Sequence, residues 1–337
     1  MKHTYGVLPS GQKTTIYTIT SGRITANITD FGATLVNLYV PDQNGKVADV
    51  VLAWDNCNDC IANKGFLGST MGRNVNRIAG AAFVLNGQKF QLPKNNGENN
   101  LHSGPDPYGF RMWQVKEHRE DSVTFLLHSP DGDQGFPGNA DICVTYRLEG
   151  NTLRILYDAV SDKDTVFNLT NHSYFNREGH DKPEKAAAQE LMMPGRFFTV
   201  TDPQGIPTGE NRSVEGTPMD FRSFKPIGRD LDADYEPMVL RKGYDHNYEA
   251  YCNPAAVLHD PYSGRTMEIS TDRPGIQIYF ANYPNGQVGK DGVPYVLHSG
   301  IAFETQFYPD SVNHPEWPQP FYKAGQPYHS ETSYTFK

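Results

Sequence analysis

The feature that most constrains the fold is a series of short runs in which apolar and polar residues alternate. Such runs occupy residues 14–19, 24–28 and 33–40, and turn sequences such as Ser21-Gly22 and Asn44-Gly45 punctuate them. Alternation with a period of two residues is typical of a strand with one buried face. Many strands joined by turns favour a sandwich or barrel over parallel βαβ units.

The composition agrees with a β-rich chain. The 337 residues include 31 Gly and 24 Pro, and aromatic residues make up 12%. The best helical segment, residues 185–193, is short, and no linker or charge block divides the chain. We therefore expect an all-β fold, one large antiparallel domain over residues 1–337 that is either a sandwich or a barrel.

The charge and hydropathy patterns exclude two classes of partner. Lys and Arg number 30 against 39 Asp and Glu, a formal net charge of −9, and no basic cluster stands out. Nucleic acid is therefore not an expected partner, because phosphate binding relies on basic patches. The N-terminus has no apolar signal segment, and no run approaches the roughly 20 apolar residues that span a bilayer. We expect no membrane partner and a soluble, cytoplasmic protein.

The four cysteines are too few for a disulfide scaffold. Cys57 and Cys60 form a C-x-x-C motif, which is found in zinc sites and redox pairs. A second such motif is absent, and Cys143 and Cys252 stand alone in strand-like sequence. We expect reduced, structural thiols.

The stretch Phe167–Asn176 crowds hydrogen-bonding side chains into a strand-like segment, among them Asn171, His172 and Ser173. Each buried polar group needs a partner, so packing alone does not account for them. His172 is a candidate for proton exchange near neutral pH, because an imidazole titrates there. The alternative is a strand end that runs into a polar loop with a structural histidine.

Four other stretches carry polar residues in places that packing does not explain. Residues 72–80 contain Asn76 and Arg77, lack a phosphate-loop pattern, and are otherwise interpreted as a surface turn with solvated arginines. His102 lies in a polar loop, and Asp245 lies between aromatic residues that would stack on a sugar, although a solvated turn is the alternative. Glu304 interrupts an apolar strand, which is costly unless the carboxylate is paired.

These groups suit a polyhydroxylated neutral ligand on which protons are moved. Opening a cyclic hemiacetal needs a base at the anomeric hydroxyl and an acid at the ring oxygen, and Glu and His provide both. Neither a cofactor nor a metal is required for this reaction.

In these motifs the chain resembles the aldose 1-epimerase, or galactose mutarotase, family. The matching segments are residues 72–80, 100–102, 168–176, 244–247, 274–277 and 303–306. The resemblance implies the mutarotase-like supersandwich and an isomerase of hexose and galactose metabolism that interconverts the anomers of free hexoses such as D-galactose and D-glucose.

The resemblance also implies a role for each site residue. Glu304 would be the general base and His172 the general acid. The sugar would be bound and oriented by His102, Arg77 and Asp245, with Asn76 and Gln277 assisting. One departure is Ser103, where a second glycine would be expected in a Leu-His-Gly-Gly turn.

Several alternatives remain open at this point. Asp245 and Glu304 would serve a glycosidase as its carboxylate pair. A silent sugar-binding module fits the aromatic, β-rich composition, and His102, His172 and Asp245 have the ligand types of a metal site. A phosphorylated sugar would call for extra cations, of which these motifs supply mainly Arg77. The sequence does not distinguish a monomer from a homodimer.

Overall fold

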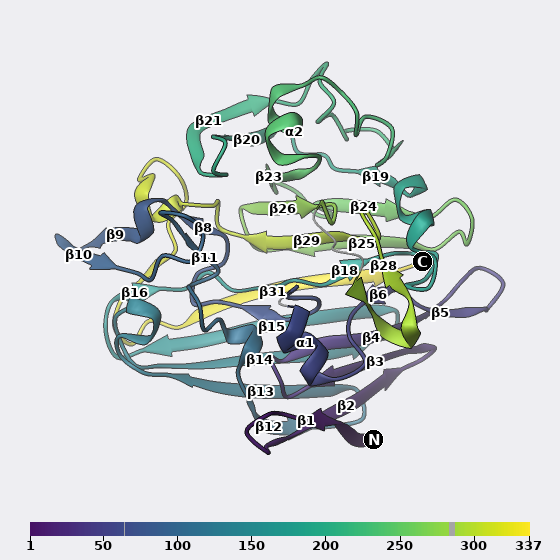
Figure 1. Ribbon diagram of the computed structural model, residues 1–337, viewed down its shortest axis with the longest axis horizontal. Coiled ribbons are helices and arrows are strands. Elements are labelled where there is room, and N and C mark those ends of the chain that lie inside the picture. Colours follow the sequence, from purple (N-terminus) through teal and green to yellow (C-terminus); the bar gives the residue numbers. More distant parts are fainter. Residues whose placement is uncertain (64, 283–286) are drawn as a thin grey trace.

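The computed structural model describes residues 1–63, 65–282 and 287–337, and antiparallel sheets dominate this part of the chain (Figure 1). The largest sheet has nine strands. Its order is β12 (Gln114–His118), β13 (Ser122–Ser129), β14 (Ala140–Glu149), β15 (Thr152–Ser161), β31 (Tyr328–Phe336), β25 (Thr266–Thr271), β24 (Ala256–His259), β19 (Glu190–Met192) and β22 (Lys225–Pro226).

A second sheet of seven strands carries most of the candidate site, and in Figure 1 its strands appear level with β25, β24 and β19 of the first sheet. Its order is β21 (Pro207–Ser213), β20 (Phe197–Thr201), β23 (Asp245–Glu249), β26 (Gly275–Tyr279), β29 (Ile301–Gln306), β18 (Tyr174–Phe175) and β6 (Val51–Leu52).

The remaining strands form a five-stranded sheet and several two-stranded ribbons. The sheet contains β1 (Lys2–Val7), β2 (Lys13–Ser21), β3 (Ile24–Thr29), β4 (Thr34–Pro41) and β5 (Val47–Asp49). The ribbons pair β7 (Thr70–Met71) with β17 (Thr170–Asn171), β8 (Arg77–Ile78) with β11 (Asn100–Leu101), β9 (Ala82–Leu85) with β10 (Gln88–Gln91), β16 (Thr165–Val166) with β30 (Phe321–Tyr322), and β27 (Gln287–Val288) with β28 (Pro294–Tyr295).

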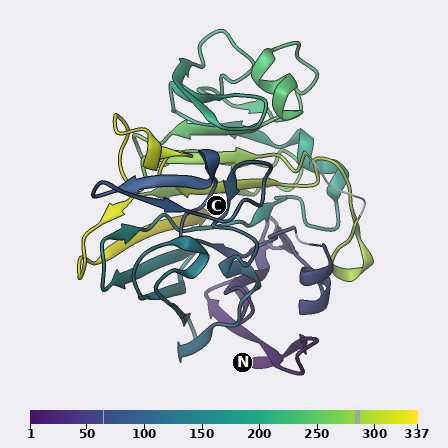
Figure 2. The ribbon, with the colours of Figure 1, turned by 60° about the vertical axis from the view of Figure 1, so that its left-hand side comes forward.

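Helices are short in the described residues. The α-helices are α1 (Cys57–Asn63) and α2 (Glu236–Arg241); together with β20 and β21, α2 projects at one end of the molecule in both ribbon views (Figure 2). The 3-10 helices are η1 (Ala79–Ala81), η2 (Tyr108–Phe110), η3 (Asp133–Gly135), η4 (Pro183–Ala188), η5 (Lys290–Gly292) and η6 (Ser311–Asn313). None of the described helices has the length and apolar character needed to span a bilayer.

The sheets pack face to face over an apolar core, which confirms the expected β-sandwich. Strand β2 of the small sheet contacts β13 and β14 of the large one. Along β14 the side chains alternate between buried and exposed, as the period-two pattern requires. The main apolar cluster takes residues from Ile19 to Phe336, so both ends of the chain contribute to one core.

The strands expected at 14–19, 24–28 and 33–40 are confirmed as β2, β3 and β4. The expected helix over 185–193 is wrong, because η4 ends at Ala188 and β19 begins at Glu190. Tertiary contacts override the local helical preference there. Leu191 pairs with Leu258 of β24, and the buried Gln189 side chain accepts the backbone N–H of Arg177 (2.8 Å).

The cysteines are free thiols. Cys57 and Cys60 belong to α1 and are buried. Burial raises the pKa of Cys60 to about 12. A thiol with such a pKa is a poor nucleophile and metal ligand, which agrees with a structural role.

Candidate active site

One face of the seven-stranded sheet carries the candidate base. In the register of β29, β26 and β23, Glu304 pairs with Gln277 and Tyr279 pairs with Asp245. Paired residues and alternate residues along a strand share a face, so these four side chains lie on the same side of the sheet. Their neighbours point into the core instead, as the buried Phe303 shows.

The candidate acid is positioned where two short strands meet. Between β17 and β18, the backbone N–H of His172 donates to the carbonyl of Ser69 (2.9 Å). Nε2 of His172 then lies 3.6 Å from Oε1 of Glu304. Two residues further on, Tyr174 stacks on the imidazole with ring centroids 5.0 Å apart. The geometry brings a proton donor and a proton acceptor to one point.

Most of the other polar residues of 167–176 support the backbone. Nδ2 of Asn171 donates to the carbonyl of Gly68 (2.6 Å), and Nδ2 of Asn176 donates to that of Lys182 (2.8 Å). Oδ1 of Asn168 accepts the N–H of Phe307 (2.9 Å). These amides fix the loop that presents His172.

A second pair of short strands presents the candidate sugar-binding groups. Leu101 of β11 pairs with Arg77 of β8. The next residue, His102, donates its backbone N–H to the carbonyl of Asn76 (3.1 Å), and the N–H of Asn76 donates to Nδ1 of His102 (3.2 Å). A ring nitrogen that accepts carries no proton, so neutral His102 carries its proton on Nε2. His102 is therefore a donor.

Ser103 fits the turn in which a glycine was expected. Its φ is 73°, in the left-handed region that glycine occupies at least cost. Its hydroxyl compensates, since Oγ accepts the N–H of Asn74 (2.8 Å) and donates to the carbonyl of the same residue (3.0 Å).

Arg73 is buried as well and donates to the carbonyls of residues 137 and 138, so the interpretation of residues 72–80 as a turn of solvated arginines is wrong for Arg73.

Asp245 is held by two partners. Nε of Arg241 donates to its Oδ2 (3.1 Å), as does Nη2, and Nε2 of Gln277 donates to Oδ1 (2.7 Å). Arg241 is the last residue of α2 and was not singled out in the sequence. Nε of Arg77 donates to Oδ1 of Asn96 (3.1 Å).

These groups surround a cavity of about 300 Å³, a volume in the range of small-molecule sites. Six of the residues predicted from the sequence line it: Asn76, Arg77, His102, His172, Asp245 and Glu304. Gln277 does not line it and instead hydrogen-bonds to Asp245, which does. Further lining residues that sequence reasoning missed are Arg241 and the aromatic side chains of Trp54, Phe66, Tyr279 and Tyr295.

Burial and neighbouring charges raise the pKa of one site residue, Glu304, and lower the pKa values of the two histidines and of Asp245. Burial, assisted by the charge of Asp245, raises the pKa of Glu304 to about 8, although Arg77 opposes the shift. Burial lowers the pKa of His172 to about 4 and that of His102 well below its usual range. For Asp245 burial raises the pKa, but the charges of Arg241 and Arg77 outweigh it and lower the pKa to about 2.

The donor set that would suit a metal differs from the one considered in the sequence. Ligand atoms of His102, His172 and Glu304 lie within 4.8 Å of one another. Two imidazoles and a carboxylate have the character that transition metals prefer. Asp245, expected in that set, instead binds Arg241 and Gln277.

Known proteins match this chain over nearly its whole length. The family model described as aldose 1-epimerase matches residues 15–335. The aldose 1-epimerase of Haemophilus influenzae is 39% identical, with 91% of each chain covered. The galactose mutarotase of Bos taurus is 35% identical, with 98% of this chain and 97% of the relative covered.

A solved structure agrees with the sequence relatives. The aldose epimerase homologue from C. elegans superposes with a TM-score of 0.87 at 32% identity, covering 96% of this chain and 98% of that one. The fold, the family model and the relatives together show that this chain belongs to the aldose 1-epimerase family.

Proposed function

We propose that this enzyme interconverts the α and β anomers of free hexoses such as D-galactose and D-glucose, with Glu304 and His172 as its acid–base pair. The observation that carries the proposal is the 3.6 Å approach of His172 Nε2 to Glu304 Oε1. Both side chains face one cavity of sugar size. The family and the names of the relatives, aldose 1-epimerase and galactose mutarotase, support the reaction.

The reaction is a transfer of two protons with no net change in composition. Glu304 accepts the proton of the anomeric hydroxyl, and the electron pair left on that oxygen forms the C1 carbonyl as the bond from C1 to the ring oxygen breaks. His172 gives its proton to the ring oxygen. Rotation about the C1–C2 bond exposes the other carbonyl face, and closure returns both protons along the same route.

Sugar binding would convert the resting protonation state of Glu304 and His172 into the reactive one. The directions of the pKa shifts place the shared proton on Glu304 rather than on His172. An anomeric hydroxyl that donates to Glu304 favours the carboxylate, and a ring oxygen that accepts from His172 favours the imidazolium. The proton moves over a short path, so the active ion pair forms when the sugar is in place.

Buried acceptors are available for the sugar hydroxyls. Oε2 of Glu304 is buried and has no hydrogen-bond partner among the described residues, and the same is true of Nδ1 of His172. An unsatisfied buried polar atom is costly, so such atoms mark places for ligand groups.

The remaining residues bind and orient the sugar. Nε2–H of His102 and the guanidinium of Arg77 donate to ring hydroxyls, and Asp245 accepts from them. Asn76 sets the orientation of His102 through its backbone, and Gln277 sets that of Asp245. The aromatic walls cover the apolar faces of the sugar.

Polarimetry on freshly dissolved α-D-galactose and α-D-glucose tests the proposal. Wild type should accelerate the optical relaxation in the presence of a chelator, and Glu304→Gln and His172→Asn should each lower kcat by about 10²-fold or more. Glu117→Gln, at a half-exposed carboxylate on β12, is the matched control and should behave as wild type. Unchanged relaxation with folded wild type would overturn the proposal, and loss of activity to the chelator would favour a metal at His102, His172 and Glu304.

We also place the enzyme in the cytoplasm. Support comes from the four free cysteines, which suit a reducing compartment. Fractionation of the source cells tests this assignment. Recovery of the protein outside the cytosolic fraction would contradict it.

A further inference from the structure

The turn between β20 and β21 is held by its own hydrogen bonds. The backbone N–H of Gly205 donates to the carbonyl of Asp202 (2.9 Å), and Oδ1 of Asp202 accepts the N–H groups of Gln204 (2.8 Å) and Ile206 (2.9 Å). An aspartate that accepts from the backbone two residues further on stabilises a turn in one conformation. This turn can therefore serve as a fixed surface for the side chains that pack against it.

The same turn docks on the strand pair that presents Arg77 and His102. Oε1 of Gln204 accepts from Nδ2 of Asn99 (3.0 Å), and Oδ1 of Asn99 accepts the backbone N–H of Gly80 (2.9 Å). Asn99 is buried and lies just before β11, and Gly80 lies shortly after β8. One side chain thus joins the turn to both strands of the pair.

Gly205 leaves room at the turn for the guanidinium groups of two arginines. A Cβ built on Gly205 would lie 2.8 Å from Nη1 of Arg241 and 3.0 Å from the guanidinium carbon of Arg77. Atoms in contact prefer a separation of about 3.5–4.0 Å, so a side chain here would displace both groups by roughly half an ångström or more. Both arginines line the cavity. The turn therefore limits where two cavity side chains can lie.

Each guanidinium group is hydrogen-bonded to a partner. Nε of Arg241 donates to Oδ2 of Asp245 (3.1 Å), and Nε of Arg77 donates to Oδ1 of Asn96 (3.1 Å). The end of a long side chain can swing aside at little cost in stability, because it has several rotatable bonds. The donors in the cavity would move with it, however, and a misplacement of about 1 Å can lower activity by about 10²-fold.

We propose that Gly205 is a positioning residue of the sugar site. Its turn is the surface against which the guanidinium groups of Arg77 and Arg241 rest, and a residue without a side chain lets them lie where they bind the sugar and orient Asp245. The inference rests on the proposed function, because it takes the sugar-binding roles of Arg77 and Asp245 from it. It holds for whichever hydroxyl groups of the sugar these residues contact.

Gly205→Ala tests this role, with Gly132→Ala as its matched control. The two glycines have φ values of 80° and 81°, so alanine brings comparable backbone strain to both. A Cβ on Gly132 would meet nothing within 4 Å apart from its chain neighbours, whereas one on Gly205 would meet the two guanidinium groups. The pair of variants therefore separates displacement of the arginines from strain in a turn.

The two variants should differ in sugar binding and agree in stability. Gly205→Ala should raise KM for galactose at least about tenfold and change kcat by less than about threefold, because Glu304 and His172 keep their places. Gly132→Ala should keep the wild-type KM and kcat. Tm should fall by a similar amount in both, within roughly 2 °C. A purely structural role of Gly205 would lower Tm without separating KM from kcat.

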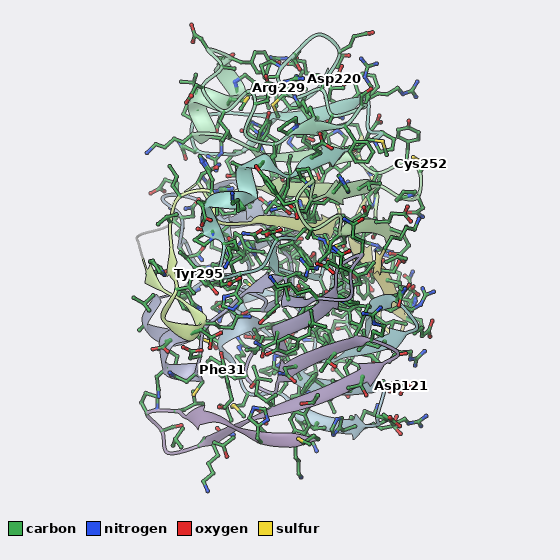
Figure 3. All side chains as sticks on the ribbon, turned by 90° about the vertical axis from the view of Figure 1, so that its right-hand side faces the viewer. Phe31, Asp121, Asp220, Arg229, Cys252 and Tyr295 are labelled. Atoms are coloured by element: carbon green, nitrogen blue, oxygen red, sulfur yellow. The ribbon has the colours of Figure 1, made fainter. Side chains whose placement is uncertain are left out.

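A second control lies between β22 and α2. Arg229 pairs with Asp230 and is far from the cavity residue Tyr295 (Figure 3). Arg229→Gln removes an arginine from this end of the molecule without changing the turn, and it should leave KM for galactose at the wild-type value. A KM raised as much as in Gly205→Ala would show that any change at this end weakens binding, and would overturn the assignment to Gly205.

Titration calorimetry with methyl β-D-galactoside provides a second measurement. This glycoside cannot open, so its affinity reports sugar binding without the proton transfers. Gly205→Ala should bind it at least about tenfold more weakly than wild type and Gly132→Ala do. If Gly205→Ala does not fold, Gln204→Ala removes the hydrogen bond from the turn to Asn99 without adding an atom, and it should weaken binding about threefold. Unchanged affinity in folded Gln204→Ala would then overturn the inference.

The failure of this inference is distinguishable from that of the proposed function. Equal KM and equal glycoside affinity in Gly205→Ala and Gly132→Ala would overturn the inference and leave the proposed function intact, and so would a loss confined to kcat. Folded wild type that does not accelerate the interconversion of anomers would overturn the proposed function instead. The titration would still decide whether Gly205 positions the groups that bind the sugar.

Discussion

At the scale of single residues, the carboxyl group of Glu304 illustrates how the fold prepares the site. The strand places it on the cavity face of a sheet, next to Gln277, with its carboxyl group buried. Burial favours the neutral acid, and the charge of Asp245 adds to the effect. The reaction needs the carboxylate, so the ionisation of this one group should govern the pH dependence.

The first prediction concerns that pH dependence. The active pair holds one proton, which rests on Glu304 in the free enzyme and is lost as pH rises through its pKa of about 8, so kcat/KM for galactose should be level below about pH 8 and fall above it. Polarimetric rates at saturating and limiting sugar between pH 6 and pH 9, at roughly constant ionic strength, measure it. A profile that is flat over this range would contradict the assignment of Glu304 as base.

The second prediction concerns stability. The pKa of Glu304 is about 8 in the folded protein against the ordinary glutamate value of 4.5, so between these values the folded state keeps a proton that the unfolded chain has lost. The free energy of unfolding therefore falls as pH rises through this window. Glu304→Gln removes the effect, and its Tm relative to wild type should increase by at least about 2 °C from pH 5 to pH 9.

Thermal melts of both proteins across the window measure this difference. Glu117→Gln should melt in parallel with wild type at every pH, because its carboxylate is half exposed. A constant difference between Glu304→Gln and wild type would show that the buried carboxyl group does not titrate as described.

Sequence reasoning found the residues whose chemistry conflicts with their surroundings. Glu304 interrupts an apolar strand, and His172 lies in a strand crowded with amides, so both stand out from a pattern of packing. Arg241 did not, because a basic residue at the end of a short helix is ordinary. Asp245 lies only four residues further along the chain, so the pair was visible in the sequence, but a basic residue close to an acidic one is too common to indicate a site.

At the scale of elements, the hairpin of β27 and β28 forms a wall of the cavity through Gln287 and Tyr295. A buried ion pair in η5 anchors it to the five-stranded sheet. Nζ of Lys290 donates to Oδ2 of Asp49 (2.5 Å) and to the carbonyl of Val36 (2.7 Å). The hairpin thus depends on a charge pair whose members do not line the cavity.

The third prediction tests this anchor. Lys290→Met removes the cation beside the buried Asp49 carboxylate, which would keep only its neutral donors such as Asn37 and Leu38, so the free energy of unfolding should fall by about 3 kcal/mol. The loosened wall should raise KM for galactose several-fold while kcat changes less. Lys323→Met, at an exposed lysine that pairs with Asp164, is the control and should alter neither quantity. An unchanged KM in a destabilised Lys290→Met protein would separate the anchor from sugar binding.

Periodicity predicted the long strands and failed for the short ones. The strands β2, β3 and β4 alternate over enough residues to show a period of two. The strands that present His172, Arg77 and His102 have two residues each, too few for any period. Their pairing is set by tertiary contacts, so motif chemistry rather than periodicity indicated this part of the site.

At the scale of the whole molecule, we propose that the chain forms a single domain, as its composition suggested. The last strand, β31, lies in the middle of the nine-stranded sheet between β15 and β25, and the main core cluster joins both ends of the chain (Figure 1). A sheet closed by its final strand is not complete until the C-terminus is in place.

The fourth prediction follows from that topology. Calorimetry should show one cooperative unfolding transition, and a chain that ends before Tyr328 should fail to fold, because β15 and β25 would lose their common neighbour. Two separable transitions, or a folded truncated chain, would indicate independent domains. The prediction is independent of the catalytic assignment.

The central claim is that Glu304 and His172 act as one acid–base unit on the anomeric centre. Magnetization transfer between the anomeric protons of α- and β-D-galactose at equilibrium tests it most directly, since it reports interconversion without any other step. The account predicts rapid exchange with wild type. It also predicts that Glu304→Gln, His172→Asn and the double variant are all reduced to a similar residual rate, because residues that act as a unit are not additive. Wild-type exchange in either folded single variant would contradict it.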